Sequence, residues 1–350
     1  MSVSISDVAA RAGVSRATVS HVLSGNRPVS QRVQSLVREA MQDLGYVPSR
    51  TAQNLARGTT RTIGLLVPDI GNSFFADLAK GVEQASIERG FNVLLGNTGW
   101  TSEREIFYLE TLKSRAIDGV VYAAGAPAPT SRLAELFAGV PVVAVDEELD
   151  GLALTTVVSD NRAGGALAAR HLAGLGHQRA VVVGANPHLA SSKHRVDGFV
   201  HTWGELVGRT PEVIEGPFEE EAGYLAASHL VPRIRIGEVT AVFALNDLVA
   251  LGALRALREA GLQIPTACSV VGFDDIYAAR HVIPGLTTVR QDAVGMGALA
   301  ASALLGVLAP TNGETRSSRH ILPVSLTLRG TTGPLLHPTP VDGGDNDGGH

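Results

Sequence analysis

Apolar side chains recur along this chain in two different rhythms. Over roughly the first 45 residues their spacing is that of amphipathic helices, and it predicts three of them. The inward positions are Val8, Ala9 and Ala12, then Val19, Val22 and Leu23, then Val33, Leu36, Val37, Ala40, Met41 and Leu44. From about residue 62 onward, apolar runs of four to six residues alternate with helical stretches, which is typical of strand–helix repeats.

Cap and turn residues divide the first part of the chain. The expected boundary residues are Ser6 and Asp7 at the first helix start, Gly13 in the turn, Ser15 at the second start, Ser30 at the third start and Gly45 at its end. The second helix would then run from about Arg16 to Leu23. Two helices joined by so short a turn predict a helix-turn-helix, which places its second helix in the major groove of DNA.

The rest of the chain predicts an α/β body. The expected strands are Ile63–Val67, Asn92–Leu95, Gly119–Tyr122, Val140–Val145, Ala180–Val183, Ala241–Leu245 and Ser269–Phe273. The expected helices lie near 74–89, 102–115, 163–175, 192–207, 221–231 and 247–260. This order favours mostly parallel sheets with helices on both faces. About 270 residues exceed a comfortable single core, so two lobes are expected.

Charge separates the two parts further. Residues 1–61 contain eight arginines, no lysine and three acids, a net charge of +5, and the remainder carries −10. A basic head on an acidic body binds DNA phosphates with the head while the body is repelled. The alternative is a structural three-helix bundle with a chance positive face. The caps, the glycine turn and the charge agree on the DNA-binding interpretation.

Pro48–Arg57 is too short to hold a helix alone in water, where roughly 12–15 residues are needed. Leu55 is its one large apolar side chain. A leucine inserted between base steps from the minor groove kinks the duplex. The segment's spacing equally allows a frayed linker with Leu55 packed on the body.

The sequence shows no pattern for a metal site, a phosphate-binding loop or a membrane span. The single cysteine, Cys268, lies beside an apolar strand and is expected in the core. The histidines show no metal-ligand spacing, and no glycine-rich phosphate loop follows a strand. No apolar stretch approaches the roughly 20 residues that span a bilayer, and the chain enters the head without a signal peptide. We therefore expect no metal, cofactor or membrane partner, and a cytoplasmic, nucleoid-associated location.

The motifs taken together resemble the LacI/GalR family of bacterial transcription regulators. The resemblance runs from Asp7–Leu23 through Tyr46–Pro48 and Ala52–Ala56 into the body. Its markers there are Thr62–Pro68, Asn72–Phe75, Asp160–Gly165, His171–His177, Asn246–Gly252, Val270–Asp275 and Leu286–Gln291. It implies a homodimer, possibly a tetramer, that reads a pseudo-palindromic operator in double-stranded DNA. It also implies a periplasmic-binding-protein-like body with three crossings between its lobes.

The resemblance assigns DNA contacts to the head and hinge. The residues so implied are Ser15, Arg16, Ala17, Thr18, Ser20, His21, Asn26, Arg50 and Leu55. Arg16 and Ala17 stand where the family varies its base contacts, and arginine pairs bidentately with guanine. Leu55 matches the minor-groove wedge, which favours the wedge over the frayed linker.

Polar residues at strand ends mark a candidate effector cleft, because ligands of open α/β sheets bind outside the carboxyl ends of the strands. Asp247 and Asp275 are expected to cap or brace it. By positional match to the family, the expected contacts are Phe74, Asp146, Ser191, Arg195, Phe218, Asn246 and Asp274. Leu189 stands where purine-responsive members carry a basic residue, which favours a sugar over a nucleobase.

The sequence thus predicts a sugar-controlled transcription repressor of carbohydrate-utilisation genes, not an enzyme. The implied division is 1–48 for the head, 49–61 for the hinge helix and linker, 62–160 plus 291–320 and 161–290 plus 321–332 for the lobes, and 333–350 for a disordered acidic tail. A sugar-transport protein or an α/β enzyme would explain the body alone, but neither requires the basic head. Inducer or co-repressor, and repressor or activator, stay open.

Overall fold

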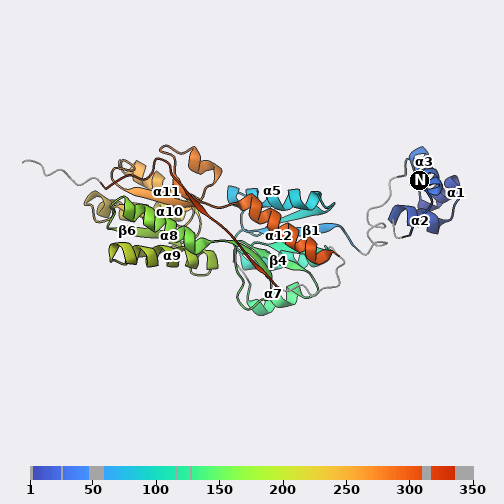
Figure 1. The fold of residues 1–350 in the computed structure, drawn as a ribbon, viewed down its shortest axis with the longest axis horizontal. Coiled ribbons are helices and arrows are strands. Elements are labelled where there is room, and N and C mark those ends of the chain that lie inside the picture. Colours follow the sequence, from blue (N-terminus) through green and yellow to red (C-terminus); the bar gives the residue numbers. More distant parts are fainter. Residues whose placement is uncertain are drawn as a thin grey trace, which may run out of the picture.

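The structure is a computed structural model, and it describes residues 3–24, 27–46, 59–114, 117–126, 128–309 and 317–335. A head of three helices comes first, and a body built on two six-stranded sheets follows (Figure 1). The predicted fold class, a helical head on a two-lobed α/β body with mostly parallel sheets, is confirmed. The expected hinge residues Arg50 and Leu55, loop residue Asn26 and residues 336–350 of the expected tail lie outside the described residues. The expected tail start at 333 is too early, because the Gly333 N–H donates to Ser269 Oγ at 3.1 Å and the Leu335 N–H donates to the Leu175 carbonyl at 3.0 Å.

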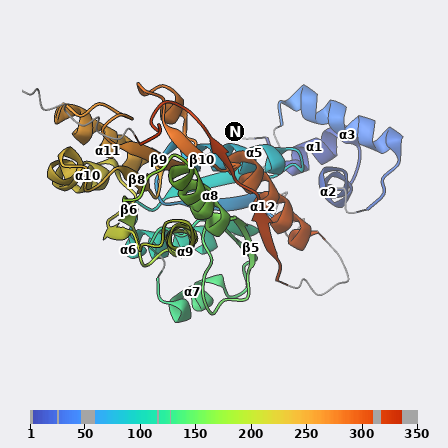
Figure 2. The same ribbon diagram turned by 60° about the vertical axis from the view of Figure 1, so that its left-hand side comes forward.

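The head consists of α1 (Ile5–Ala12), α2 (Arg16–Ser24) and α3 (Gln31–Leu44), which pack around one apolar cluster (Figure 2). Val8, Val19 and Val37 are fully buried in it, as their spacing predicted. An ion pair of 2.6 Å between Arg11 and Asp43 joins α1 to α3.

The first helix begins earlier than predicted. Its N-cap is Ser4, whose hydroxyl accepts the Asp7 N–H at 3.4 Å, while the Asp7 carboxylate accepts the Ser4 N–H at 2.8 Å. Ser6 therefore lies inside the helix, and Asp7 closes a reciprocal capping box instead of standing at the cap itself. A run of cap-forming residues permits more than one start, and only the reciprocal bond selects Ser4.

The other predicted boundaries of the head are confirmed. Gly13 and Gly45 end α1 and α3 with left-handed φ values of 65° and 62°. The Ser15 hydroxyl accepts the Thr18 N–H at 3.1 Å at the start of α2. Ser30 stands at the N-cap of α3, although its side chain makes no capping bond.

The first lobe is built on an all-parallel sheet of order β11-β5-β4-β3-β1-β2. Its strands are β1 (Thr62–Val67), β2 (Asn92–Asn97), β3 (Gly119–Tyr122), β4 (Val142–Val145), β5 (Thr155–Ser159) and β11 (Arg319–Leu322). Its helices are α5 (Ser73–Ile87), α6 (Ser102–Ser114), α7 (Thr130–Phe137) and α12 (Ala293–Leu308). Helices α5 and α12 approach so closely that a Cβ on Gly81 would lie 2.0 Å from the Val294 carbonyl oxygen.

The second lobe has the order β12-β10-β9-β8-β6-β7, in which only the β10–β12 pair is antiparallel. Its strands are β6 (Ala180–Ala185), β7 (Glu212–Glu215), β8 (Ala241–Ala244), β9 (Ser269–Asp274), β10 (Thr287–Arg290) and β12 (Ser325–Thr327). Its helices are α8 (Asn161–Gly174), α9 (Ala190–Val207), α10 (Glu220–Arg235), α11 (Asp247–Glu259) and the short 3-10 helix η1 (Tyr277–Arg280). Every strand predicted from the sequence is present, with small shifts at the ends.

The chain passes between the lobes three times. It leaves the first sheet after β5 and the second after β10, and it returns from β11 to β12 (Figure 1). The first two crossings fall where they were expected. The third lies between Leu322 and Ser325, so the predicted boundary at 320 falls inside β11 and is too early. The pairing of β11 with β5 in parallel register fixes this strand in the first lobe.

Candidate functional site

A cleft lies between the two lobes, at the carboxyl ends of both sheets. Its empty volume is about 320 Å³, counting space open to solvent. The first lobe lines it with Asn72, Phe74, Phe75, Trp100, Ala124, Asp146 and Glu147, and the second with Leu189, Arg195, Phe218, Asn246 and Asp274. All of these follow the carboxyl end of a strand in the chain or end one, as the expected geometry of open α/β sheets requires. The two sets are called here the first-lobe wall and the second-lobe wall.

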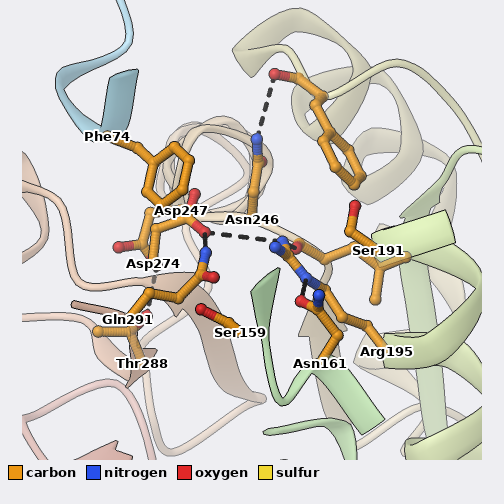
Figure 3. Close-up of polar contacts among 12 residues, drawn as sticks. Phe74, Ser159, Asn161, Ser191, Arg195, Asn246, Asp247, Asp274, Thr288 and Gln291 are labelled. Atoms are coloured by element: carbon orange, nitrogen blue, oxygen red, sulfur yellow. Dashed lines mark hydrogen bonds and ion pairs between the residues drawn. The ribbon is translucent and has the colours of Figure 1, made fainter. Parts of the chain in front are cut away.

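Arg195 is the centre of the second-lobe wall (Figure 3). Its side chain is buried, and it donates to the Leu245 carbonyl at 2.6 Å and to Asn161 Oδ1 at 2.8 Å. Its guanidinium lies 3.8 Å from the centre of the Phe273 ring and 3.6 Å from Asp274 Oδ1. A guanidinium with partners on its edge and an aromatic ring on its face is held in one orientation.

Asp274 ends β9 with φ of 118°, a backbone conformation that side chains other than glycine rarely adopt. Its Oδ1 accepts a hydrogen bond from Gln291 Nε2 at 2.7 Å (Figure 3). Burial raises the pKa of this carboxyl to about 7, although nearby Arg195 acts to lower it. Gln291 Oε1 is buried and has no hydrogen-bond partner in the described structure.

Asn246 caps α11 and faces the cleft at the same time. Its Oδ1 accepts the Val249 N–H at 2.8 Å, and its Nδ2 donates to the Phe218 carbonyl at 3.2 Å. Asp247 turns away and accepts hydrogen bonds from the Thr288 hydroxyl at 2.6 Å and the Ile276 N–H at 2.9 Å. Asp247 therefore braces the wall from behind, consistent with the sequence interpretation.

Asp146 is a carboxyl group of the first-lobe wall with an unpartnered oxygen. It follows β4 with φ of 70°, it is 8% exposed, and its Oδ1 has no hydrogen-bond partner among the described residues. Burial raises the pKa of this carboxyl to about 6 against the opposing influence of Arg195. An unpartnered buried acceptor is costly, and such groups are found where a ligand supplies the missing donor.

The neighbouring Glu147 bridges the cleft. Its Oε2 accepts the Ser191 N–H at 3.1 Å from the other lobe, and its Oε1 accepts the Ser191 hydroxyl. Burial, with the adjacent Asp146 charge, raises the pKa of Glu147 to about 8, while the bonds from Ser191 oppose this. The sequence interpretation missed Glu147, because Asp146 already filled the strand-end position.

Aromatic rings cover much of the remaining surface. Phe74 and Phe75 meet edge-to-face at 5.1 Å, and Phe75 meets Trp100 at 6.1 Å. Phe218 lies opposite, with its ring centre 5.6 Å from the Arg195 guanidinium. Trp100 was not predicted, although it follows β2 closely, and its φ of 58° marks a constrained turn.

A buried carboxylate also holds the loop that carries Ala124. Glu105 Oε1 accepts the N–H groups of Gly125 at 2.9 Å and Ala126 at 3.0 Å, and the Tyr122 hydroxyl bonds to Oε2. The loop is thereby fixed where it contributes to the first-lobe wall.

The expected effector residues converge. Six of the seven line the cleft: Phe74, Asp146, Arg195, Phe218, Asn246 and Asp274. The seventh, Ser191, is buried and reaches the cleft through Glu147. Within the described ranges, no group of three or more histidine, cysteine or acidic residues is arranged to hold a metal ion.

In the head, the expected DNA contacts gather on α2 and its cap. Ser15, Arg16 and Ala17 are exposed, and Thr18, Ser20 and His21 are half-buried. The Ser15 hydroxyl also lies 2.9 Å from the Thr18 hydroxyl, so both help to hold the first turn. Among the helices that the structure describes, none is long and apolar enough to cross a membrane.

Comparisons with known proteins agree for both parts. Residues 4–49 match bacterial regulatory proteins of the lacI family, and residues 60–328 match periplasmic binding proteins and the sugar binding domain of the LacI family. The chain is 33% identical to the HTH-type transcriptional repressor PurR of Vibrio atlanticus, over 89% of this chain and 94% of the relative.

Two solved structures are similar over most of their length. The Lac repressor dimer bound to operator and the anti-inducer ONPF is 27% identical, with a TM-score of 0.82 over 95% of this chain and 100% of that one. A LacI family transcriptional regulator from Enterococcus faecium with bound ribose is 31% identical, with a TM-score of 0.70 over 79% of this chain and 100% of that one.

Proposed function

Because this chain belongs to the LacI family of bacterial regulatory proteins, we propose that it is an operator-binding repressor whose DNA affinity is set by a sugar in the cleft. Family membership makes it a DNA-binding transcription regulator with a ligand-binding body. The similar PurR protein and Lac repressor are transcription repressors, so the enzyme alternative is set aside. A transport protein would not carry the lacI-type head.

One observation carries the sugar proposal. Asp146 presents a buried, unpartnered oxygen to a cleft that also holds aromatic faces, an amide and a guanidinium. Hydroxyl groups supply the missing donors, and the apolar faces of a sugar ring pack on aromatic side chains. We assign the effector contacts to Phe74, Asp146, Ser191, Arg195, Phe218, Asn246 and Asp274.

Leu189 supports a sugar over a nucleobase. It lines the cleft and is buried, so this position offers no charged or polar partner. The similarity to the PurR repressor concerns the whole chain, whereas Leu189 concerns the ligand contact itself. The ribose held by the similar Enterococcus faecium regulator agrees with this choice.

The proposed mechanism couples the cleft to the head through the lobe angle. A ligand that contacts both walls changes the angle between the lobes. In a dimer this shift would alter the spacing of two heads, each reading one half of a pseudo-palindromic operator through Arg16 and its neighbours. The hinge segment 49–61, with Leu55 as a minor-groove wedge, would order or separate accordingly. Ligand and operator are then coupled reciprocally.

The deciding experiment is selection of DNA sequences by the purified full chain at fixed salt, repeated with a panel of free sugars. We expect enrichment of a palindromic site that one sugar weakens. Arg16→Ala is the control, because it should lower discrimination between sites more than non-specific affinity. Enrichment that no sugar changes would contradict the sugar proposal, and no enriched site would contradict operator recognition.

A further inference from the structure

The amino end of α9 is bonded to a carboxylate from the opposite lobe. The Ser191 N–H donates to Glu147 Oε2 at 3.1 Å, and the Ser191 hydroxyl donates to Oε1. Leu189, at the N-cap of α9, offers no side-chain acceptor, and the first turn of the helix has no acidic residue. Glu147 therefore supplies the acceptor oxygens that the first turn of α9 lacks.

This position matters for ligand choice. Free N–H groups and the helix dipole make the amino end of a helix a ready site for a phosphate or carboxylate group. At this cleft, a side chain of the protein already occupies that site, and both Glu147 and Ser191 are buried. An anionic ligand group would have to displace Glu147 to reach it.

The basic side chain of the cleft is also unsuited to holding an anionic ligand. Arg195 is the only basic residue among the described residues that line the cleft. Its Nη1 and Nε donate to Leu245 and Asn161, and its face lies on the Phe273 ring. It also lies 3.6 Å from Asp274.

Three buried carboxyl groups line the same space. Asp146, Glu147 and Asp274 are each at most 8% exposed, and one oxygen of Asp146 has no partner. A phosphate placed here would bring acceptor oxygens against acceptor oxygens, and repulsion from any ionised carboxylate is poorly screened in the buried cleft. Uncharged hydroxyl groups would instead donate hydrogen bonds to the same oxygens.

We propose that Glu147 is a specificity-determining residue, which fills the anion position at α9 and thereby selects unphosphorylated, hydroxyl-rich ligands over phosphorylated or acidic ones. The ligand class rests on the proposed function of the cleft. The occupation of the amino end of α9 by Glu147 does not depend on it.

The test measures binding of inorganic phosphate to the full chain by isothermal titration calorimetry at constant ionic strength. It compares the natural chain with Glu147→Ala, Glu147→Gln and Asp150→Asn. The last removes one charge from an exposed position in the same loop. We expect no saturable binding to the natural chain or to Asp150→Asn. Glu147→Ala should bind phosphate saturably, at least about tenfold more tightly than the detection limit that the natural chain sets, because its emptied helix terminus favours an anion.

Glu147→Gln should show a smaller gain, because its amide oxygen still accepts from Ser191. It keeps the side-chain volume and decides the result if the alanine variant does not fold. Phosphate binding to the natural chain as tight as to Glu147→Ala would overturn the proposal, and so would a folded Glu147→Ala chain that gains nothing. The titration uses neither operator nor sugar, so its failure is separate from a failure of the proposed regulation.

Discussion

The two walls of the cleft are built on opposite principles. On the second-lobe wall, Arg195, Asn246 and Asp274 bond to one another or to neighbouring groups, and the oxygen of Gln291 is the exception. The first-lobe wall combines aromatic rings with Asp146, whose buried Oδ1 has no partner among the described residues. Apart from the Gln291 oxygen, the polar groups named on the second-lobe wall have partners, whereas the first-lobe wall leaves a carboxyl oxygen available to a ligand.

The difference separates the groups that stabilise the fold from the groups whose hydrogen-bonding capacity is left for a ligand. A satisfied buried network stabilises the fold and presents fixed contacts to a ligand. An unsatisfied buried carboxyl lowers the free energy of unfolding. A ligand that donates a hydrogen bond to it removes this destabilisation when it binds. The left-handed backbone of Asp146 and Asp274, with φ of 70° and 118°, shows that both walls also hold strained residues in place.

The largest effect is expected when Arg195, at the centre of the hydrogen-bonded second-lobe wall, is replaced. Arg195→Met leaves Asp274 and the Leu245 carbonyl without their buried partner, so we expect a loss of about 3–5 kcal/mol in the free energy of unfolding. Urea unfolding followed by the fluorescence of Trp100 and Trp203 measures it. Arg170→Met, on the exposed side of α8, is the control and should stay within about 0.5 kcal/mol. Equal losses would contradict the contrast.

The second test concerns the unsatisfied wall and pH. Burial raises the pKa of Asp146 to about 6, whereas the unfolded chain has the ordinary value near 3.8. Between these values the folded chain holds a proton that the unfolded chain has released, so rising pH costs stability. Asp146→Asn avoids this cost, and its free energy of unfolding should exceed that of the natural chain by about 1–3 kcal/mol at pH 8.

At pH 4 that advantage should nearly vanish, because the natural carboxyl is then protonated. Taking the difference between the two chains cancels the contributions of half-buried His171 and buried His177, whose pKa values burial lowers. If the difference in free energy of unfolding stays constant from pH 4 to 8, Asp146 has a stabilising partner, and the contrast between the two walls fails.

The third test removes one bond between the walls. Ser191→Ala deletes the hydroxyl that donates to Glu147 but keeps the backbone N–H bond. We expect the free energy of unfolding to fall by about 1 kcal/mol. Urea unfolding measures it beside Ser228→Ala, an exposed serine bonded within α10. No difference between the two variants would show that the bridge contributes nothing.

The smallest test compares the two rings beside Arg195. The guanidinium lies 3.8 Å from the Phe273 centre and 5.6 Å from the Phe218 centre. Phe218→Leu should therefore cost only about 0.5 kcal/mol through its cation–π contact. Phe273→Leu should cost more in the same unfolding measurement, and the reverse order would show that Phe218, not Phe273, is the ring that stabilises Arg195.

Much of the fold follows from local patterns that the sequence displays. Strands such as β3 and β8 are short apolar runs between turns, and each ended near its predicted position. Helix α12 was missed because its small and apolar side chains leave no polar face to set a period, and it packs against both α5 and strands β3, β4 and β5 of the first sheet. The edge strand β7 was missed because glutamates flank two apolar residues.

The residues of the site also fall into those that the sequence predicted and those that it did not. Asp146, Asn246 and Asp274 were predictable because each stands at a strand end, which topology brings to the cleft, and because each matches a family contact position. The bridge from Glu147 to Ser191 was not, because two residues 44 positions apart meet only when both lobes are in place. The partnerless oxygen of Asp146 is likewise a property of the assembled cleft.

The three passages between the lobes have a consequence for synthesis. Each lobe is interrupted in the chain, and the first sheet lacks its edge until β11 is made. During synthesis the amino end of the chain leaves the ribosome first. The head can therefore fold before the last strand of either lobe, β11 or β12, has been made. A message cut before residue 317 would therefore yield a DNA-binding head on a body with neither sheet finished. Translation of nearly the whole chain must precede any response to ligand.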